Sequence, residues 1–400
     1  MDFTIPERIQ GTLEKIESFV AEELFPLEQD FLHSSFKEMK PRLEEKRAKV
    51  KAAGLWGPNH PEDVGGMGLT LLEHGLITEV LGTSPLGHYV FGCQAPDAGN
   101  IEILHKHGTE EQHERFLQPL LEGKQRSCFS MTEKLTAGSN PTLLAATAEK
   151  DGDDYVINGE KWFSTAADGA DFSIAMVVTN PGGSASRRAS MIIVPCDTPG
   201  FEFVRNVPVM GHAGSDYDSH AEVRFNNCRV PKTNLLGREG AGFLIAQERL
   251  GPGRIHHCMR WLGICKRSFD LMCERVTKRK INENETLADT QIVQTWVAES
   301  AAEIHAARTM VLHCAWLIDN VGSTKAHVHI GMIKFYVAGI LQKVIDRAIQ
   351  AHGALGMTDD TILAHYYRHE RAARIYDGPD EVHKISIAKR MLRNYKKNGK

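Results

Sequence analysis

The sequence predicts an α+β fold of several domains. We expect an N-terminal α-helical domain over residues 1–127, a middle antiparallel β-barrel or sandwich over 128–240, and a C-terminal four-helix bundle over 241–400. Three observations support this order: helical periodicity at the start, short β-rich runs in the middle, and long periodic stretches afterwards. A chain of 400 residues is long enough for two or three such domains, each around its own core.

The N-terminal section has helical periodicity. Apolar side chains recur at helical spacing, and they place one apolar face on the predicted helix: Ile9, Leu13, Ile16, Phe19, Val20 and Leu24. A glycine-rich stretch at 61–69 interrupts the helical pattern. No predicted strand precedes it and no Lys-Ser or Lys-Thr pair follows it, so it favours a plain turn over a phosphate-binding loop.

The middle section changes to β-rich runs of four to nine residues. Turn-forming residues separate these runs, notably at 151–154 and 180–183. The pattern is typical of a small antiparallel sandwich or barrel. The runs lie at 155–163, 172–178, 191–194 and 222–225.

The C-terminal section returns to long helical periods at 241–278, 288–320 and 327–352, and a last helix is predicted after Pro379. Long helices with short connections indicate an antiparallel bundle.

Composition excludes several classes of function. The net charge of −4 favours neither nucleic acid nor an anionic membrane surface, and no apolar run predicts stable membrane insertion. The eight cysteines form no C-x-x-C pair, so we expect reduced thiols. We read the run 256–258, His-His-Cys, as ordinary helix residues and expect no metal site. No targeting signal is visible, which suggests the cytoplasm or an organellar matrix.

The most informative segment is the turn around Asp377, in the run 374–384. A carboxylate beside a glycine and a proline, where a helix is about to begin, is placed to act as a general base. A structural role fits the same residues. Asp377 or Gly378 would cap the last helix, with Pro379 in its first turn. The segment by itself does not decide between the two.

Motifs in order along nearly the whole chain resemble the acyl-CoA dehydrogenase flavoproteins. The turn at 374–384, together with 249–260, is similar to the subfamily that carries Asp-Gly-Pro where most members carry Glu-Gly-Thr. The other matching segments are a glycine loop at 61–68, two flavin strands at 128–133 and 157–165, an entry to the bundle at 229–243, and a glycine turn at 350–356.

The resemblance implies FAD-dependent oxidation of an acyl-CoA to its trans-2-enoyl-CoA. Asp377 would remove the α-proton while hydride leaves the β-carbon for the flavin. In the family a flavin ribityl hydroxyl and the backbone N–H of the base residue stabilise the enolate. The ordinary pKa of an aspartate is about 3.9, and we expect burial to raise that of Asp377. Aspartate is one methylene shorter than the usual glutamate, so its carboxylate is withdrawn by roughly 1 Å. Some family members hold the base at another position, which here is Gly253 and cannot act as a base.

The resemblance also assigns the residues that would hold substrate and cofactor. Arg254, Ser139 and Gly378 match substrate-binding positions, with Arg254 expected either to tune or orient the site or to form a structural ion pair. The flavin-binding matches are Phe129, Met131, Thr132, Ser139, Phe163, Thr165, Arg279, Lys280, Gln291, Gln350, Gly353, Gly356, Pro379 and Glu381. For Phe129, Met131 and Phe163, packing in a β core explains the residue types nearly as well. Arg279 or Lys280 would reach a neighbouring subunit, or would favour the end of its own helix.

The partners implied are an acyl-CoA substrate, an electron-transfer flavoprotein as acceptor, and further copies of the chain in a homotetramer or homodimer. The mostly small, apolar residues around 91–97 suggest a medium or long acyl chain. Two other functions stay open. One is a flavin oxidase of the same fold, similar to nitroalkane oxidases; the other is a non-catalytic acyl-CoA or fatty-acid binding protein.

Overall fold

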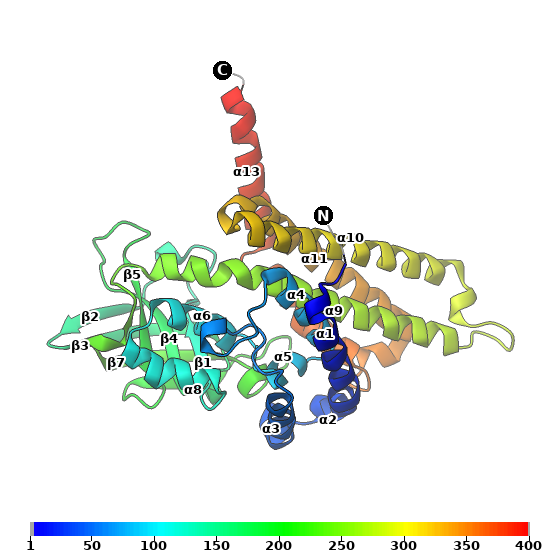
Figure 1. Ribbon diagram of the computed structural model, residues 1–400, viewed down its shortest axis with the longest axis horizontal. Helices are drawn as coiled ribbons and strands as arrows, with labels where there is room; N and C mark the ends of the chain where they lie inside the picture. The colour runs from blue at the N-terminus through cyan, green and yellow to red at the C-terminus, as the bar shows by residue number, and fades with distance from the viewer. Residues whose placement is uncertain (1–3, 399–400) are drawn as a thin grey trace. The chain divides into compact units, whose positions relative to one another are not determined.

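The computed structural model describes residues 4–398, and the chain divides into two compact units. The helical unit comprises Met1–Ser34, Leu69–Val90 and Pro252–Lys400. The sheet unit comprises Ser35–Gly68 and Phe91–Gly251. The expected order of helices, sheet and helices is confirmed (Figure 1). The three domain boundaries expected from the sequence stay a prediction.

The sheet unit is built on one eight-stranded sheet of order β6-β7-β3-β2-β4-β5-β8, with β1 paired to β4. Most neighbours are antiparallel, but the pairs β1–β4 and β2–β4 are parallel. The strands are β1 (Ser127–Ser130), β2 (Thr147–Asp151), β3 (Asp154–Thr165), β4 (Phe172–Val178), β5 (Ala189–Pro195), β6 (Phe201–Asn206), β7 (His220–Pro231) and β8 (Leu235–Leu236).

Every residue of β4 is buried, because both faces of this strand are covered. Phe172, Ile174 and Met176 point into one apolar cluster, while Ala175 and Val177 point into a second one on the other face. The alternation follows the period of two of a β-strand. Helices contribute to the first cluster through α6 (Asp97–His107), the π-helical turn His113–Leu117, α8 (Gln118–Leu121) and the start of α9 (Gly242–Lys278).

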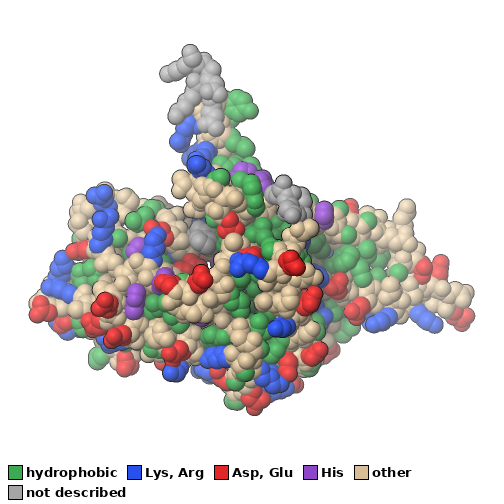
Figure 2. All heavy atoms as spheres, viewed as in Figure 1, with side chains coloured by type: hydrophobic (Ala, Val, Ile, Leu, Met, Phe, Trp, Pro, Cys, Tyr) green, Lys and Arg blue, Asp and Glu red, His purple; other side chains and the backbone are tan. Residues whose placement is uncertain are grey.

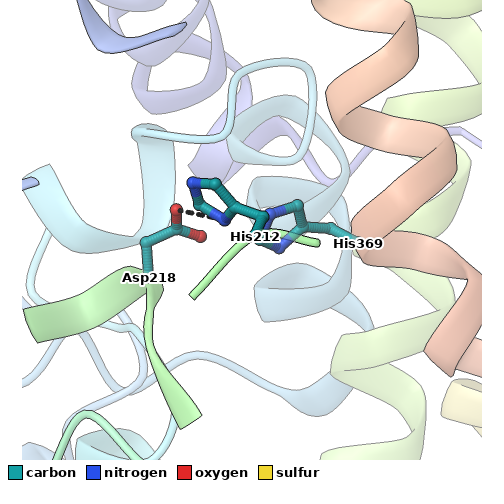
Figure 3. A group of neighbouring side chains, drawn as sticks. All are labelled: His212, Asp218 and His369. Atoms are coloured by element: carbon teal, nitrogen blue, oxygen red, sulfur yellow. Dashed lines mark ion pairs between the residues drawn. The ribbon is translucent and has the colours of Figure 1, made fainter. Parts of the chain in front are cut away.

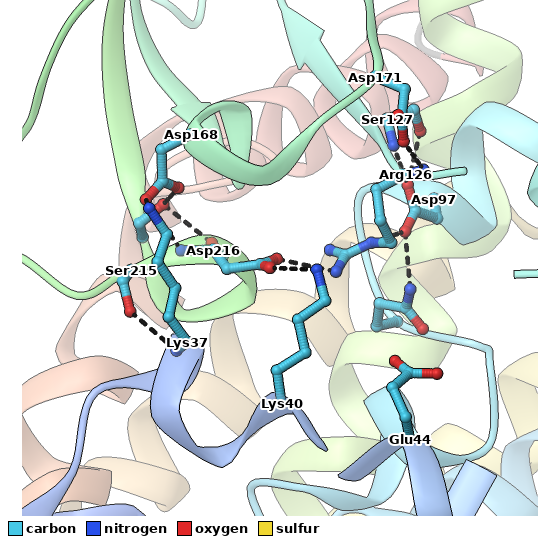
Figure 4. A network of polar contacts seen from close by, with 12 residues as sticks. Lys37, Lys40, Glu44, Asp97, Arg126, Ser127, Asp168, Asp171, Ser215 and Asp216 are labelled. Atoms are coloured by element: carbon cyan, nitrogen blue, oxygen red, sulfur yellow. Dashed lines mark hydrogen bonds and ion pairs between the residues drawn. The ribbon is translucent and has the colours of Figure 1, made fainter. Parts of the chain in front are cut away.

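A buried network of charges joins three parts of the sheet unit (Figure 4). Arg126, immediately before β1, binds Asp97 of α6 at 2.7 Å and Asp216 of a 3-10 turn at 2.9 Å. Lys40 of α3 (Phe36–Ala52) binds Asp216 at 3.0 Å. Because Arg126 and both carboxylates are almost fully buried, breaking one pair would leave an uncompensated charge. The network therefore fixes α3 against the start of β1.

The helical unit is dominated by long helices. They are α9, α10 (Gln291–Val321), α11 (Ser323–His352) and α13 (Asp380–Asn398), joined by the shorter α1 (Glu7–Phe19), α2 (Glu28–His33), α4 (Leu71–Leu81), α5 (Gly87–Val90) and α12 (Ile362–Glu370). The predicted bundle helices lie within a few residues of α9, α10 and α11. The stretch Ser323–Met357 is long and apolar enough to cross a membrane by length and composition, but most of its apolar window is buried inside the protein, as in a core helix.

The surface carries both signs of charge. Figure 2 shows acidic and basic side chains interspersed on the visible face, without a large region of one sign. All eight cysteines lie in the described part of the chain and are free thiols. His212 and Asp218 of the sheet unit form an ion pair at 3.8 Å (Figure 3). His369, also drawn there, belongs to α12 of the other unit, and we assign no metal site to this group.

Candidate active site

Asp377 lies on the turn between the 3-10 segment Arg371–Arg374 and α13, inside the helical unit. Its φ is +51° and that of Gly378 is +102°, so two successive residues have left-handed backbone. Aspartate tolerates this region better than most residues, and glycine has no Cβ to oppose it. A Cβ at residue 378 would lie 2.7 Å from Nε2 of His383, so any other residue would also displace this ring. The turn is therefore a defined conformation, which the sequence Asp-Gly-Pro favours.

Three side chains hold the backbone of this turn. Arg254 Nε donates to the carbonyl oxygen of Asp377 at 3.1 Å, and a ring nitrogen of His383 lies 3.2 Å from the same oxygen. Lys334, which is fully buried on α11, donates to the carbonyl oxygens of Ala373 at 2.6 Å and Gly378 at 3.0 Å. These contacts satisfy carbonyls that the irregular turn leaves without partners in a helix or sheet.

The carboxylate of Asp377 is largely buried, with 17 % of its side chain exposed. Its Oδ2 lies 3.3 Å from Nε2 of His257 on α9. Burial lowers the pKa of Arg254 and Lys334 from their ordinary values, while the negative charge of Asp377 opposes that shift in both. Burial, followed by the charge of Arg254, lowers the pKa of His383 to about 4. His383 is therefore neutral at pH 7, while Arg254 provides a positive charge near Asp377.

The predicted substrate and cofactor residues of the helical unit fall into two groups. Arg254 and Gly378 adjoin Asp377, as described, and Pro379 precedes α13. Arg279 directly follows α9, and its side chain reaches the C-terminal end of α11. There its Nη1 donates to the carbonyl of Ala351 at 3.1 Å and would lie 2.9 Å from a Cβ at residue 353. Gly356 is buried, whereas the remaining predicted side chains are exposed and accessible to a ligand or another subunit: Lys280, Gln291, Gln350 and Glu381.

The predicted flavin residues of the sheet unit lie at the ends of β1 and β3. The backbone N–H of Trp162 donates to the carbonyl of Thr132 at 2.8 Å, which joins the two segments. The pairing of β3 with β7 shifts register between Lys161 and Ser164, and Phe163 within this bulge has a φ of +57° and is 39 % exposed. The bulge thus directs an aromatic ring outward next to Thr132 and Thr165.

These side chains suit an isoalloxazine. Phe163 offers exposed apolar surface, whereas Met131 and Phe129 also pack against the apolar cluster on one face of β4. The hydroxyls of Thr132 and Thr165 offer hydrogen bonds, and that of Thr165 already lies 2.9 Å from Nδ1 of His220. Nε1 of Trp162 is buried and has no hydrogen-bond acceptor among the described residues, as expected of a site that is completed by a ligand. The ring of Phe129 is covered on one side by the guanidinium of Arg249, 4.1 Å away, and Ser139 is exposed on the following loop.

Several residues of the site were not predicted from the sequence. His257 was interpreted as an ordinary helix residue, and Lys334 and His383 were not considered. One signal was present for Lys334, because a single lysine in the apolar run 330–341 has to find buried acceptors. No local pattern indicates that His257 lies against a residue 120 positions later.

Comparison with known proteins agrees with this architecture. The family models for the N-terminal, middle and C-terminal domains of acyl-CoA dehydrogenases match residues 7–124, 128–228 and 240–392. The chain is 43 % identical to a probable acyl-CoA dehydrogenase of Mycobacterium tuberculosis, over 98 % of this chain and 97 % of that protein. It is 40 % identical to acyl-CoA dehydrogenase family member 11 of Gallus gallus, over 95 % of this chain but only half of that protein.

Among solved structures, a putative acyl-CoA dehydrogenase from Mycobacterium abscessus aligns with a TM-score of 0.94 at 38 % identity, over 98 % of this chain and all of that one. The similarity thus extends over all three sections of the sequence and over both units of the structure. The chain therefore belongs to the acyl-CoA dehydrogenase family, whose members are FAD-dependent oxidoreductases that act on acyl-CoA thioesters.

Proposed function

We propose that this chain oxidises a medium- or long-chain acyl-CoA to the trans-2-enoyl-CoA, with Asp377 as the base. The observation that supports this most strongly is the position of Asp377: a largely buried carboxylate on a left-handed turn whose carbonyls are held by Arg254, His383 and Lys334. A base held in one geometry lowers the entropic cost of proton transfer. Membership of the family shows FAD-dependent chemistry on an acyl-CoA. The length of the acyl chain and the identity of the base are our proposal.

The proposed step moves one proton and one hydride. The Asp377 carboxylate takes the α-proton, the electrons of that C–H bond form the Cα=Cβ double bond, and hydride leaves the β-carbon. The chemistry that FAD supplies when bound is acceptance of this hydride. We assign flavin contacts to Met131, Thr132, Phe163 and Thr165. The backbone N–H of Asp377 would donate to the thioester carbonyl, which makes the α-proton acidic enough to remove.

We further propose that an electron-transfer flavoprotein re-oxidises the enzyme and that the subunits form a homo-oligomer, as is typical of the family. The free cysteines agree with a reducing compartment, such as the cytoplasm or an organellar matrix.

The test is anaerobic titration of the flavin-loaded protein with acyl-CoAs from butyryl- to palmitoyl-CoA. We expect flavin absorbance to fall most with a medium or long chain. The variant Asp377→Asn should keep the yellow flavin and bind acyl-CoA, but should lose at least ~100-fold in the rate of flavin reduction because it lacks the base.

Other results would point to other functions. Oxygen consumption with nitroethane, without reduction by any acyl-CoA, would indicate an oxidase. Acyl-CoA binding that leaves the flavin oxidised would indicate a binding protein. Undiminished reduction in Asp377→Asn would exclude this residue as the base.

A further inference from the structure

His257 is the side chain on α9 that lies against the Asp377 carboxylate, with Nε2 3.3 Å from Oδ2. Both residues belong to the helical unit. Both are shielded, with 24 % of the histidine side chain and 17 % of the aspartate side chain exposed. The two atoms lie at ion-pair distance, and a contact between an imidazole nitrogen and a carboxylate oxygen is stronger in a partly dry environment than in water.

The imidazole packs against two aromatic rings, which also contact each other with their centroids 5.9 Å apart. The ring centroid of Trp261, one helical turn further along α9, lies 5.9 Å away and is nearly parallel, while that of Tyr376 lies 4.9 Å away. Nε1 of Trp261 donates to the Tyr376 hydroxyl at 2.9 Å, and Arg260 Nη2 donates to it at 2.8 Å. Because Tyr376 directly precedes Asp377, the same aromatic contacts fix both members of the pair.

An aspartate base needs such a partner more than a glutamate does. The shorter side chain brings the carboxylate into reach from fewer orientations, and a misplacement of about 1 Å can cost ~100-fold in rate. The backbone contacts of Arg254, Lys334 and His383 fix where the side chain starts. A contact on one carboxylate oxygen adds a constraint on the rotation of the carboxylate about its last bond.

We propose that His257 is a positioning residue for Asp377: its Nε2–H holds Oδ2 and thereby directs Oδ1 to the α-proton of the substrate. This inference rests on the proposed function. It adds a residue that acts through the base and makes no contact with substrate.

Charged and titratable groups surround the pair of His257 and Asp377. His256 and Arg260 flank His257 on α9, His88 lies near it on α5, and Asp377 and Tyr376 face it from the turn before α13. Burial lowers the pKa of His256 to about 3, and its Nε2 lies 2.8 Å from Nδ1 of His74 on α4. The neighbouring histidine is therefore neutral and has its own partner, which makes it a suitable comparison.

The test compares His257→Phe and His257→Gln with the wild type, all loaded with FAD. Phenylalanine keeps the aromatic contacts with Trp261 and Tyr376 but has no N–H, whereas glutamine restores a donor. We expect His257→Phe to lose 10- to 100-fold in the rate of anaerobic flavin reduction with little change in KM. The acidic limb of the pH–rate profile of His257→Phe should shift to higher pH. The reason is that the Asp377 carboxylate without a donor holds its proton more tightly. His257→Gln should recover part of the rate.

His256→Phe is the matched control. It removes a buried histidine from the same helical turn, and we expect lower thermal stability with an unshifted acidic limb. A wild-type rate and pH profile in His257→Phe would overturn the inference, as would a loss of stability without a shift of the limb. Failure of the wild type to be reduced by any acyl-CoA, or full activity in Asp377→Asn, would instead overturn the proposed function and this inference with it.

Discussion

At the scale of single residues, the turn around Asp377 depends on one buried amine. Nζ of Lys334 is the donor for two carbonyl oxygens that belong to no helix ladder, and its side chain is fully buried. Burial lowers the pKa of Lys334, which shows that placing a charge here is unfavourable in itself. Its contribution to stability therefore comes from the carbonyls that it satisfies.

We expect Lys334→Met to lower the free energy of unfolding by roughly 2–4 kcal/mol, since two buried carbonyls lose their donor while the volume is conserved. The loss is partly offset because a buried charge is also removed. Urea denaturation would measure it. Lys343→Met is the control on the same helix: that lysine is 60 % exposed and pairs with Glu303, and should cost less than about 1 kcal/mol. Equal effects of the two substitutions would contradict the prediction.

At the scale of secondary-structure elements, the end of β1 is joined to β3 by a buried ion pair. Nζ of Lys161 lies 2.8 Å from the Glu133 carboxylate and donates to the carbonyl of Met131 at 3.1 Å. Glu133 also accepts from the backbone N–H groups of Ala145 and Ala146, at 2.7 and 3.0 Å. Thr132 directly precedes Glu133, and Phe163 lies two residues after Lys161. The ion pair therefore holds both residues at fixed positions.

We expect Lys161→Met to be strongly destabilising, by about 3–5 kcal/mol, because Glu133 would be left buried and without its cation. The double variant Lys161→Met with Glu133→Gln should recover a large part of this loss, since no lone charge remains. Denaturation of the four proteins of this cycle gives the coupling free energy, and retention of flavin on gel filtration reports the site. A double variant that is as unstable as the sum of the single ones would show that the pair is not coupled.

At the scale of the whole molecule, buried titratable groups determine how stability depends on pH. Burial lowers the pKa of His60, His220 and His383 to about 4 and that of His256 to about 3. These histidines are neutral in the folded protein and gain protons on unfolding below pH 6.5. Their contribution to the free energy of unfolding is complete above pH 6.5 and is lost as the pH falls toward 4. Each histidine loses at most about 1.4 kcal/mol per pH unit.

Two glutamates act in the opposite direction. Burial raises the pKa of Glu28 and Glu102 to about 7, so their contribution is complete below pH 4.5 and is lost as the pH rises through 7. Burial also lowers the pKa of His88 well below its ordinary value, so the buried histidines outnumber the two glutamates. We therefore expect the free energy of unfolding to fall by at least roughly 3 kcal/mol between pH 7 and pH 5. Urea midpoints by circular dichroism at the two values would measure this. A higher midpoint at pH 5 would contradict it.

The surface of α13 bears on assembly. Its first turns pack against α11, where Gly331 makes room for Ile387. Beyond this contact Met391, Leu392 and Tyr395 are exposed, and Figure 1 shows the helix continuing past α11. Apolar side chains in such an exposed row are typical of an interface.

We expect the purified protein to be a homotetramer, and Leu392→Glu to shift it to smaller species in sedimentation velocity because a charge would be buried at the contact. Leu143→Glu is the control, since Leu143 is 53 % exposed in the sheet unit, compared with 59 % for Leu392. A monomeric wild type at micromolar concentration would contradict this prediction, as would a Leu392→Glu protein that assembles like the wild type.

The sequence by itself determined the class and order of the elements and the conformation of the turn at Asp377. These depend on short-range effects: helical and strand periods, the turn residues between strands, and the tolerance of Asp-Gly for left-handed backbone. The long helices fall where their apolar periods predicted them. The prediction of two flavin strands came from the family resemblance, because their motifs are recognisable without any contact being known.

Only the tertiary structure decided which side chains surround Asp377 and which buried ion pair joins the end of β1 to β3. His257, Lys334 and His383 reach the turn from three helices, and Lys161 meets Glu133 from another strand. Such partners are chosen by packing between segments that are distant in sequence, where a small change of register brings different atoms together. Periodicity shows which face of an element is buried, but the residue opposite it follows only from the three-dimensional arrangement.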